Sequence, residues 1–219
     1  MKFSNFFENN IIIFLILPLV PETLKRLIDF ISYMPGIGEK TAVKLAFFLL
    51  KANGSYVKNF ARELEKLQTD IRDCQTCFGL TDNHRTICAI CADEKREKNI
   101  LCVVEDYLDM LSIERLGIFH GYYHILGGSI SPIHGRMPNS LHFQELFERI
   151  QNHPEIQELI IATNPNIEGE ATNLYIEENI PRKDLKLTRL SKGLPNAGYI
   201  EYADDITLIN AFKGRIERG

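Results

Sequence analysis

The chain has 219 residues, of which 45% are hydrophobic and 25% are charged. This composition excludes a collagen-like, a largely disordered and a polytopic membrane protein, and the length allows one large domain or two small ones. The formal net charge is −4, so the chain as a whole lacks the strong positive field of a generic nucleic-acid-binding protein. The cysteine count of 5 is odd, which argues against complete internal disulfide pairing.

An almost unbroken apolar run extends from Ile11 to Val20. It is roughly half as long as a membrane-spanning helix, and no small-residue cleavage site follows it. Three interpretations stay open: a packed N-terminal segment, a weak membrane contact, or an extension from an upstream start codon. We expect a cytoplasmic protein without stable membrane association, because the rest of the chain has the sequence features of a cytosolic protein.

Two apolar-faced helices are predicted on either side of a glycine-containing turn, the first over 21–32 and the second ending near residue 53. A third helix is predicted over 56–69. In the second helix the apolar spacing predicts a buried side made of five residues, Ala42, Leu45, Ala46, Leu49 and Leu50.

The turn between the first two helices has the composition of a phosphate-binding site. Gly36 and Gly38 permit a sharp turn and leave backbone N–H groups uncovered at the positive end of the second helix. Lys40 and Lys44, one helical turn apart, could then contact successive phosphates without reading sequence. The alternative is a plain helix–turn–helix corner.

Four cysteines form two closely spaced pairs, Cys74-x2-Cys77 and Cys88-x2-Cys91. Two such pairs can present four thiolates to one ion, which predicts a closed tetrahedral zinc site with a structural role. The alternative is redox-active or disulfide-forming pairs. Cys102 is predicted to be a buried strand residue.

Beyond the cysteines, apolar runs at 100–104, 122–126, 158–163 and 185–190 predict strands. Helical patterns at 107–116, 140–152 and 170–179 separate them, and a short strand and helix are predicted over 198–218. This alternation predicts an α/β fold with a mostly parallel sheet covered on both faces.

Acidic and amide side chains follow two of these strands. Glu105 ends the first strand, and Asn164 and Asn166 follow a later one. Carboxylates at two strand ends could hold Mg²⁺, but amides lack the charge to bind it strongly, so catalysis is disfavoured.

The charges are unevenly distributed along the chain. Residues 36–62 carry five cations and one anion, whereas residues 99–190 carry seven cations and thirteen anions. This basic N-terminal part and this acidic C-terminal part predict two functional surfaces of opposite charge.

From about Glu22 onward the chain resembles the RecR family of bacterial recombination-repair proteins. The matching blocks include MPGIGEKTAVKLAFFLL, the four cysteines, ILCVVE, YYHILGGSISPIHG, ATNPNIEGEATNLYI and IEYADDITLINAFKGR. The resemblance implies a helix-hairpin-helix over 21–70, a C4 zinc finger over 71–96, a Toprim domain (Rossmann-like) over 97–193 and a C-terminal oligomerisation segment over 194–219. Residues 1–20 have no counterpart.

The resemblance also implies roles for single residues. It assigns DNA contacts to Gly36, Gly38, Lys40 and Lys44, and zinc binding to the four paired cysteines. In catalytic Toprim proteins a glutamate acts with an Asp-x-Asp pair, which Asn164 and Asn166 replace here. The remaining acidic residues are expected to serve partner binding or the fold, namely Glu105, Glu168 and Glu170.

The expected function is that of a non-catalytic DNA-binding mediator of recombinational repair. Members of the family form homo-oligomeric rings, commonly tetramers or else dimers, and act with RecO and RecF to load RecA onto single-stranded DNA. Two alternatives stay open: a divergent Mg²⁺-dependent Toprim nuclease or primase, and a protein-interaction adaptor without DNA binding.

Overall fold

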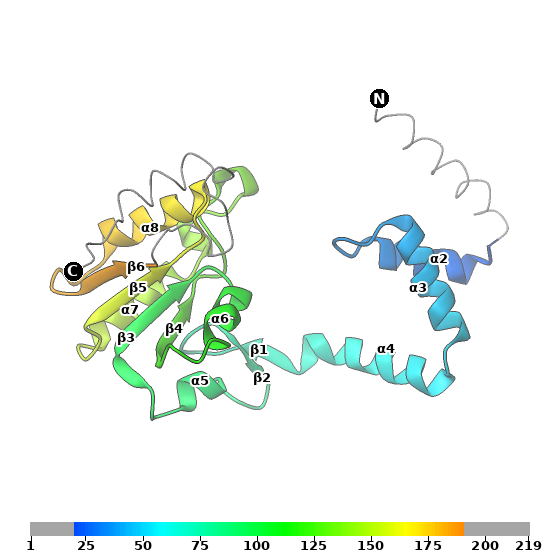
Figure 1. The fold of residues 1–219 in the computed structure, drawn as a ribbon, viewed down its shortest axis with the longest axis horizontal. Helices are drawn as coiled ribbons and strands as arrows, with labels where there is room; N and C mark the ends of the chain where they lie inside the picture. Colours follow the sequence, from blue (N-terminus) through cyan, green and yellow to red (C-terminus); the bar gives the residue numbers. More distant parts are fainter. Residues whose placement is uncertain (1–19, 191–219) are drawn as a thin grey trace, which may run out of the picture. The chain divides into compact units, whose positions relative to one another are not determined.

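The computed structural model describes residues 20–190, which fall into two compact units that divide after Leu67 (Figure 1). The expectations for residues 1–19 and for the C-terminal segment, including its strand and helix, lie outside the described residues. Within 20–190 no helix is both long enough and apolar enough to cross a membrane.

The first unit contains the three predicted helices, α2 (Glu22–Ser32), α3 (Glu39–Lys51) and α4 (Gly54–Thr69). Its small core lies between α2 and α3 and consists of five buried residues, Leu24, Ile28, Ile31, Ala42 and Ala46. The alanines lie one turn apart on α3 and, having short side chains, let the two helices approach closely.

The prediction that Leu45 and Leu50 are buried is wrong for the single chain, because these side chains are 37% and 65% exposed. Leu49 is half-buried. Helix α3 packs on α2 through the narrow stripe that contains Ala42 and Ala46, so the flanking leucines stay outside.

The second unit begins with a small antiparallel hairpin, β1 (Ile71–Asp73) and β2 (Leu80–Asp82), followed by the short helix α5 (Ala89–Ala92). The four paired cysteines are distributed over this hairpin and α5. Three of them are buried although the segment contributes few apolar side chains of its own.

From β3 to residue 190, the unit forms a four-stranded sheet in which every neighbouring pair of strands is parallel. The strands are β3 (Glu97–Val104), β4 (Gly121–Ile125), β5 (Glu158–Ala162) and β6 (Lys186–Arg189), in the spatial order β4-β3-β5-β6. The connections contain α6 (Tyr107–Glu114), α7 (Phe143–Asn152) and α8 (Ile167–Asn179), and two short 3-10 turns, η2 (Pro132–His134) and η3 (Pro138–Ser140). The predicted α/β fold is therefore confirmed.

Alternate residues of β3 divide the core into two layers. Leu101 and Val103 pack with α7 and α8 on one face, whereas Cys102 and Val104 pack with α6 on the other (Figure 1). Cys102 is buried as predicted, and burial raises the pKa of its thiol to about 12. A sheet that is apolar on both faces needs cover on both sides, and these helices provide it.

His124 is a fully buried polar side chain on the edge strand β4. Its Nε2 lies 2.8 Å from the backbone oxygen of His142, while its Nδ1 has no hydrogen-bond partner within 20–190. Burial lowers the pKa of His124 from its ordinary value of 6.5 to about 3. His124 is therefore neutral in the folded protein at pH 7 and donates through Nε2.

The neutral state of His124 predicts a pH-dependent stability. His124 takes up a proton near pH 6.5 in the unfolded chain and only near pH 3 in the folded protein. Its contribution to the free energy of unfolding is therefore fully present above pH 6.5 and is lost as the pH falls toward 3. Between pH 7 and pH 5 we expect this residue to remove about 2 kcal/mol from the free energy of unfolding. Urea unfolding of wild type and His124→Gln at both pH values measures it; an equal pH dependence in the two proteins would contradict the assignment.

Candidate nucleic-acid interface and metal centre

The hairpin between α2 and α3 is an open, exposed turn. Gly36 has a φ of +79°, a left-handed conformation that side-chain-bearing residues rarely adopt. Apart from the adjacent residues, no heavy atom of the described chain lies within 4 Å of the position that a Cβ would take on Gly36 or Gly38. Gly38 precedes the first residue of α3, and within residues 20–190 no side chain caps this helix end. A ligand can therefore approach the backbone at the N-terminus of α3.

The two lysines of the predicted phosphate site follow directly. Lys40 lies in the first turn of α3 and Lys44 one turn later, and both are exposed. The structure thus brings the four predicted residues together on one hairpin. Two exposed amines beside a helix N-terminus favour phosphate groups, and the exposed Glu39 in the same first turn offsets one of the two positive charges.

The four cysteine sulfur atoms form a compact cluster in which all Sγ atoms lie within 4.8 Å of one another. The Sγ atoms of Cys77 and Cys88 are 3.6 Å apart, close to the edge of about 3.8 Å expected for a tetrahedron of thiolates around zinc. The four ligand atoms therefore fit a closed metal site, and the structure confirms that the two cysteine pairs converge.

Backbone groups organise the sulfur atoms. Three backbone N–H groups donate to cysteine sulfur atoms at 3.3–3.4 Å. The N–H of Cys88 donates to Cys74, that of Gly79 to Cys77, and that of Cys91 to Cys88. Phe78 adopts a φ of +61°, which turns the chain sharply after Cys77. The hydrogen bonds from Cys77 and Cys91 lower the pKa of the Cys88 thiol, which favours the thiolate that binds metals.

The loop over residues 74–79, here named the knuckle, is attached to the edge strand β4. The backbone N–H of Ile125 donates to the carbonyl of Cys77 at 2.8 Å. Arg149 of α7 donates from Nη1 to the carbonyls of Thr76, at 3.2 Å, and Tyr123, at 2.7 Å. The Ile125 N–H and the Tyr123 carbonyl lie on the edge strand, where backbone groups often have no partner. Both are hydrogen-bonded here.

An aromatic contact reinforces this attachment. The ring of Phe78 stacks on that of His142, with centroids 3.9 Å apart, and meets His124 edge-on at 5.4 Å. Sequence reasoning found the cysteines but missed Phe78 and Arg149. No spacing rule marks either residue, since each acts through a partner that is distant in sequence.

Glu105 lies at the carboxyl end of β3, as predicted, and is only 4% exposed. One carboxylate oxygen accepts the backbone N–H of Asn164 at 2.7 Å, and the other accepts its side-chain amide at 2.8 Å. Gly169 packs so closely on this corner that a Cβ there would overlap the Asn164 carbonyl. Glu105 therefore ties β3 to the loop that follows β5.

The neighbouring predicted residues have different positions. Asn166 caps α8 by accepting the N–H of Gly169 at 2.7 Å, so it is Asn164, and not Asn166, that donates to Glu105. Glu170 forms a two-pronged ion pair with Arg189 of β6, at 2.7 and 2.8 Å. Glu168 lies in the first turn of α8 and is half-buried.

Comparison with known proteins agrees with this organisation. Residues 24–67 match the family model of the RecR helix-hairpin-helix, and residues 99–191 match that of the Toprim domain. The Recombination protein RecR of Anaeromyxobacter dehalogenans (strain 2CP-C) is 43% identical over 198 residues, which cover 90% of this chain and 98% of the relative. The chain belongs to the RecR family.

A second relative, the Recombination protein RecR of Anaeromyxobacter sp. (strain Fw109-5), is 42% identical over 198 residues. Membership in the RecR family supports a role in recombination and repair. The helix-hairpin-helix, the four-cysteine cluster and the Toprim sheet that the resemblance implied are all present.

The Glu105–Asn164 contact makes a testable prediction about stability. Asn164→Ala removes the side-chain donor to a buried carboxylate, so we expect the free energy of unfolding to fall by about 1–3 kcal/mol. The control is Asn139→Ala, which removes an exposed amide in η3 and should change stability by less than about 0.5 kcal/mol. Urea unfolding measures both; equal effects would show that the contact is not stabilising.

Proposed function

We propose that this protein is a non-catalytic DNA-binding mediator of recombinational repair. It forms an oligomeric clamp on DNA and acts with RecO and RecF to load RecA onto single-stranded DNA. The observation that carries the DNA-binding part is the open hairpin, in which Gly36 and Gly38 expose the N-terminus of α3 beside Lys40 and Lys44. Phosphate contacts of this kind bind the backbone of DNA irrespective of sequence. A DNA ligand would also associate the protein with the nucleoid.

The absence of catalysis is supported by the state of Glu105. Both of its oxygen atoms accept hydrogen bonds from Asn164, which gives this buried carboxylate a structural role between β3 and the loop after β5. The residues that would complete the site are the amides Asn164 and Asn166. A nuclease or primase activity would need carboxylates at these positions.

Zinc is the metal that the cysteine cluster fits best. Four thiolates with no other ligand suit zinc, and a site filled by four protein ligands has no open position for chemistry. We therefore assign one structural zinc ion to Cys74, Cys77, Cys88 and Cys91. When bound, it would hold the hairpin, α5 and the knuckle in one arrangement.

Self-association is supported by α4, in which no residue is buried. Its apolar side chains include Phe60, Leu64 and Leu67, each more than 40% exposed. A helix that presents such a surface normally packs against a partner. Several copies around one DNA would also add their few lysine contacts through effective concentration. We propose a homo-oligomer, a tetramer or a dimer.

Each segment of the chain is proposed to have its own role. The helix-hairpin-helix over 21–70 binds DNA, the zinc finger over 71–96 stabilises the adjacent Toprim domain over 97–193, and residues 194–219 contribute to assembly. Partner proteins are proposed to contact the acidic part of the chain, residues 99–190, at Glu168 and Glu170. Glu105 supports that surface from within, because it is buried.

Reversing the charge of both hairpin lysines tests the DNA interface. We expect Lys40→Glu with Lys44→Glu to weaken DNA binding at least about tenfold, and the salt dependence to lose roughly 0.7–0.9 in slope per phosphate contact removed. Fluorescence anisotropy with a labelled oligonucleotide at several salt concentrations measures both quantities.

The matched control is Lys95→Glu with Lys183→Glu, which makes the same change in net charge at two exposed positions of the second unit. It should bind nearly as wild type does. Equal losses in the two variants would assign the effect to net charge and remove the hairpin assignment. A wild-type protein that binds no DNA would favour the adaptor alternative.

Removing one ligand tests the zinc site. We expect Cys88→Ser to purify without stoichiometric zinc and to melt at least about 5 °C below wild type, because the metal contributes folding free energy. The control is Cys102→Ala, which removes a buried thiol outside the cluster and should keep one zinc ion per chain. Elemental analysis and thermal melting measure this; a zinc-free Cys88→Ser protein with the wild-type melting temperature would contradict a structural role.

A further inference from the structure

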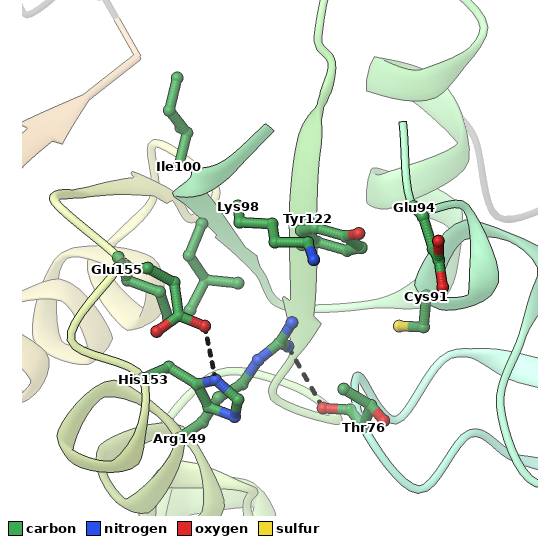
Figure 2. A pocket seen from close by; sticks show the side chains of 11 residues that line it. Thr76, Cys91, Glu94, Lys98, Ile100, Tyr122, Arg149, His153 and Glu155 are labelled. Carbon is green, nitrogen blue, oxygen red and sulfur yellow. Dashed lines mark hydrogen bonds and ion pairs between the residues drawn. The ribbon is translucent and has the colours of Figure 1, made fainter. Parts of the chain in front are cut away.

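A pocket of about 270 Å³ lies at the end of the sheet opposite to Glu105, in the second unit (Figure 2). Its wall comes from the knuckle, the loop after α5, the starts of β3 and β4, and the segment that begins near the end of α7. The lining includes Thr76, Cys91, Lys98, Tyr122, Arg149 and Ile156. One lining residue, Cys91, is also assigned to the zinc site, but none of the functions proposed above uses the pocket itself.

Two cations extend into the pocket from different elements. Figure 2 shows the side chains of Lys98, from β3, and Arg149, from α7, reaching toward the same hollow. In the described chain neither of them forms an ion pair with a carboxylate. Their charge is partly offset within the lining, because Glu155 lies near Lys98 and the sulfur atoms of Cys91 and Cys77 lie near Arg149. The case for an anionic ligand therefore rests on the hydrogen-bond geometry of Arg149.

The hydrogen bonds of Arg149 leave a defined edge for that ligand. Its Nη1 donates to the carbonyls of Thr76 and Tyr123, whereas its Nε and Nη2 donate to no group of the described residues. Nε and Nη2 form the side of a guanidinium that binds a carboxylate through two parallel hydrogen bonds. The pocket therefore offers a two-pronged oxyanion site.

The other lining residues restrict the ligand further. Glu94 and Glu155 lie at the pocket, and Glu155 is paired with His153 Nδ1 at 2.9 Å. These carboxylates disfavour a polyanion such as DNA but tolerate a single negative charge. Ile100, Tyr122 and Ile156 supply an apolar wall, and the volume of about 270 Å³ is large enough for a small organic acid or an amino-acid side chain.

We propose that this pocket binds a carboxylate attached to an apolar body, with the carboxylate on the free edge of Arg149 and near Lys98. A free apolar acid and a glutamate side chain beside an apolar residue offer the same chemistry. Because Arg149 also holds the Thr76 carbonyl, ligand binding stabilises the knuckle and its attachment to β4. A bound ligand therefore raises the melting temperature of the folded protein.

The test uses the full-length protein with its zinc and the probe 3-phenylpropanoate, measured by isothermal titration calorimetry and thermal shift. We expect a dissociation constant on the order of 1 mM or tighter and no binding of the uncharged 3-phenylpropanamide. The blocked dipeptide acetyl-Glu-Leu-amide is the second arm. Tighter binding of the peptide assigns the site to a protein segment, and tighter binding of the free acid assigns it to a small molecule.

Variants separate this site from general effects. Arg149→Lys keeps the positive charge but loses the two-pronged edge and should bind at least about tenfold more weakly. Lys98→Met, which alters an exposed side chain, should weaken binding several-fold without changing zinc content. Lys95→Met is the matched control, because Lys95 is an exposed lysine nearby that does not line the pocket.

Three results would overturn the proposal. They are equal binding of the acid and its amide, wild-type affinity in Lys98→Met and Arg149→Lys, and displacement of the probe by a thymidine oligonucleotide. The last result would assign the pocket to nucleic-acid phosphate instead. Because Lys98→Met leaves the hydrogen bonds of Arg149 intact, the test holds even if Arg149→Lys folds poorly.

Discussion

The arrangement of the second unit depends on how the edge strand β4 is closed. An exposed parallel edge presents unpaired N–H and C=O groups, which invite pairing with other chains. Here the Ile125 N–H donates to the carbonyl of Cys77, and the Tyr123 carbonyl accepts from Arg149, which also holds Thr76. The cysteine cluster is therefore attached to the sheet by hydrogen bonds, so a metal bound by the four cysteines would stabilise the edge strand as well.

The opposite end of the sheet has a hydrogen-bonded corner built from one carboxylate and one amide. Glu105 keeps its position at the end of β3, where ligand sites of parallel sheets gather. Asn164 turns it into a buried hydrogen-bonded link by donating to both carboxylate oxygens. An aspartate at this position would place a second negative charge beside Glu105 and would need a cation between them. The amide removes that need, and the acidic side chains nearby become available for ion pairs such as Glu170 with Arg189.

Much of the fold followed from local patterns in the sequence, because helical and strand periodicities are set by neighbours along the chain. The strands of the sheet, the convergence of the cysteines and the position of Glu105 were all predicted correctly. The burial of Leu45 and Leu50 was not, because periodicity identifies an apolar face but not how much of it a neighbour covers. Arg149 and Phe78 were missed for a related reason: their partners, Tyr123 and His142, lie far along the chain, and neither has a spacing signature.

The uneven charge follows from the same division into two units. The net charge of −4 is a sum in which the positive charge of the hairpin region and the negative charge of the Toprim region partly cancel. At physiological salt, surface charges act over about 8 Å, so a phosphate near Lys40 and Lys44 would respond to charges within that range and not to the net charge of the chain. Two lysines and one helix end nevertheless give few contacts, and affinity for DNA rises steeply with their number. For the proposed DNA interface, several hairpins presented at once would therefore raise the affinity, and the exposed apolar side chains of α4 form the surface that we propose for such an assembly.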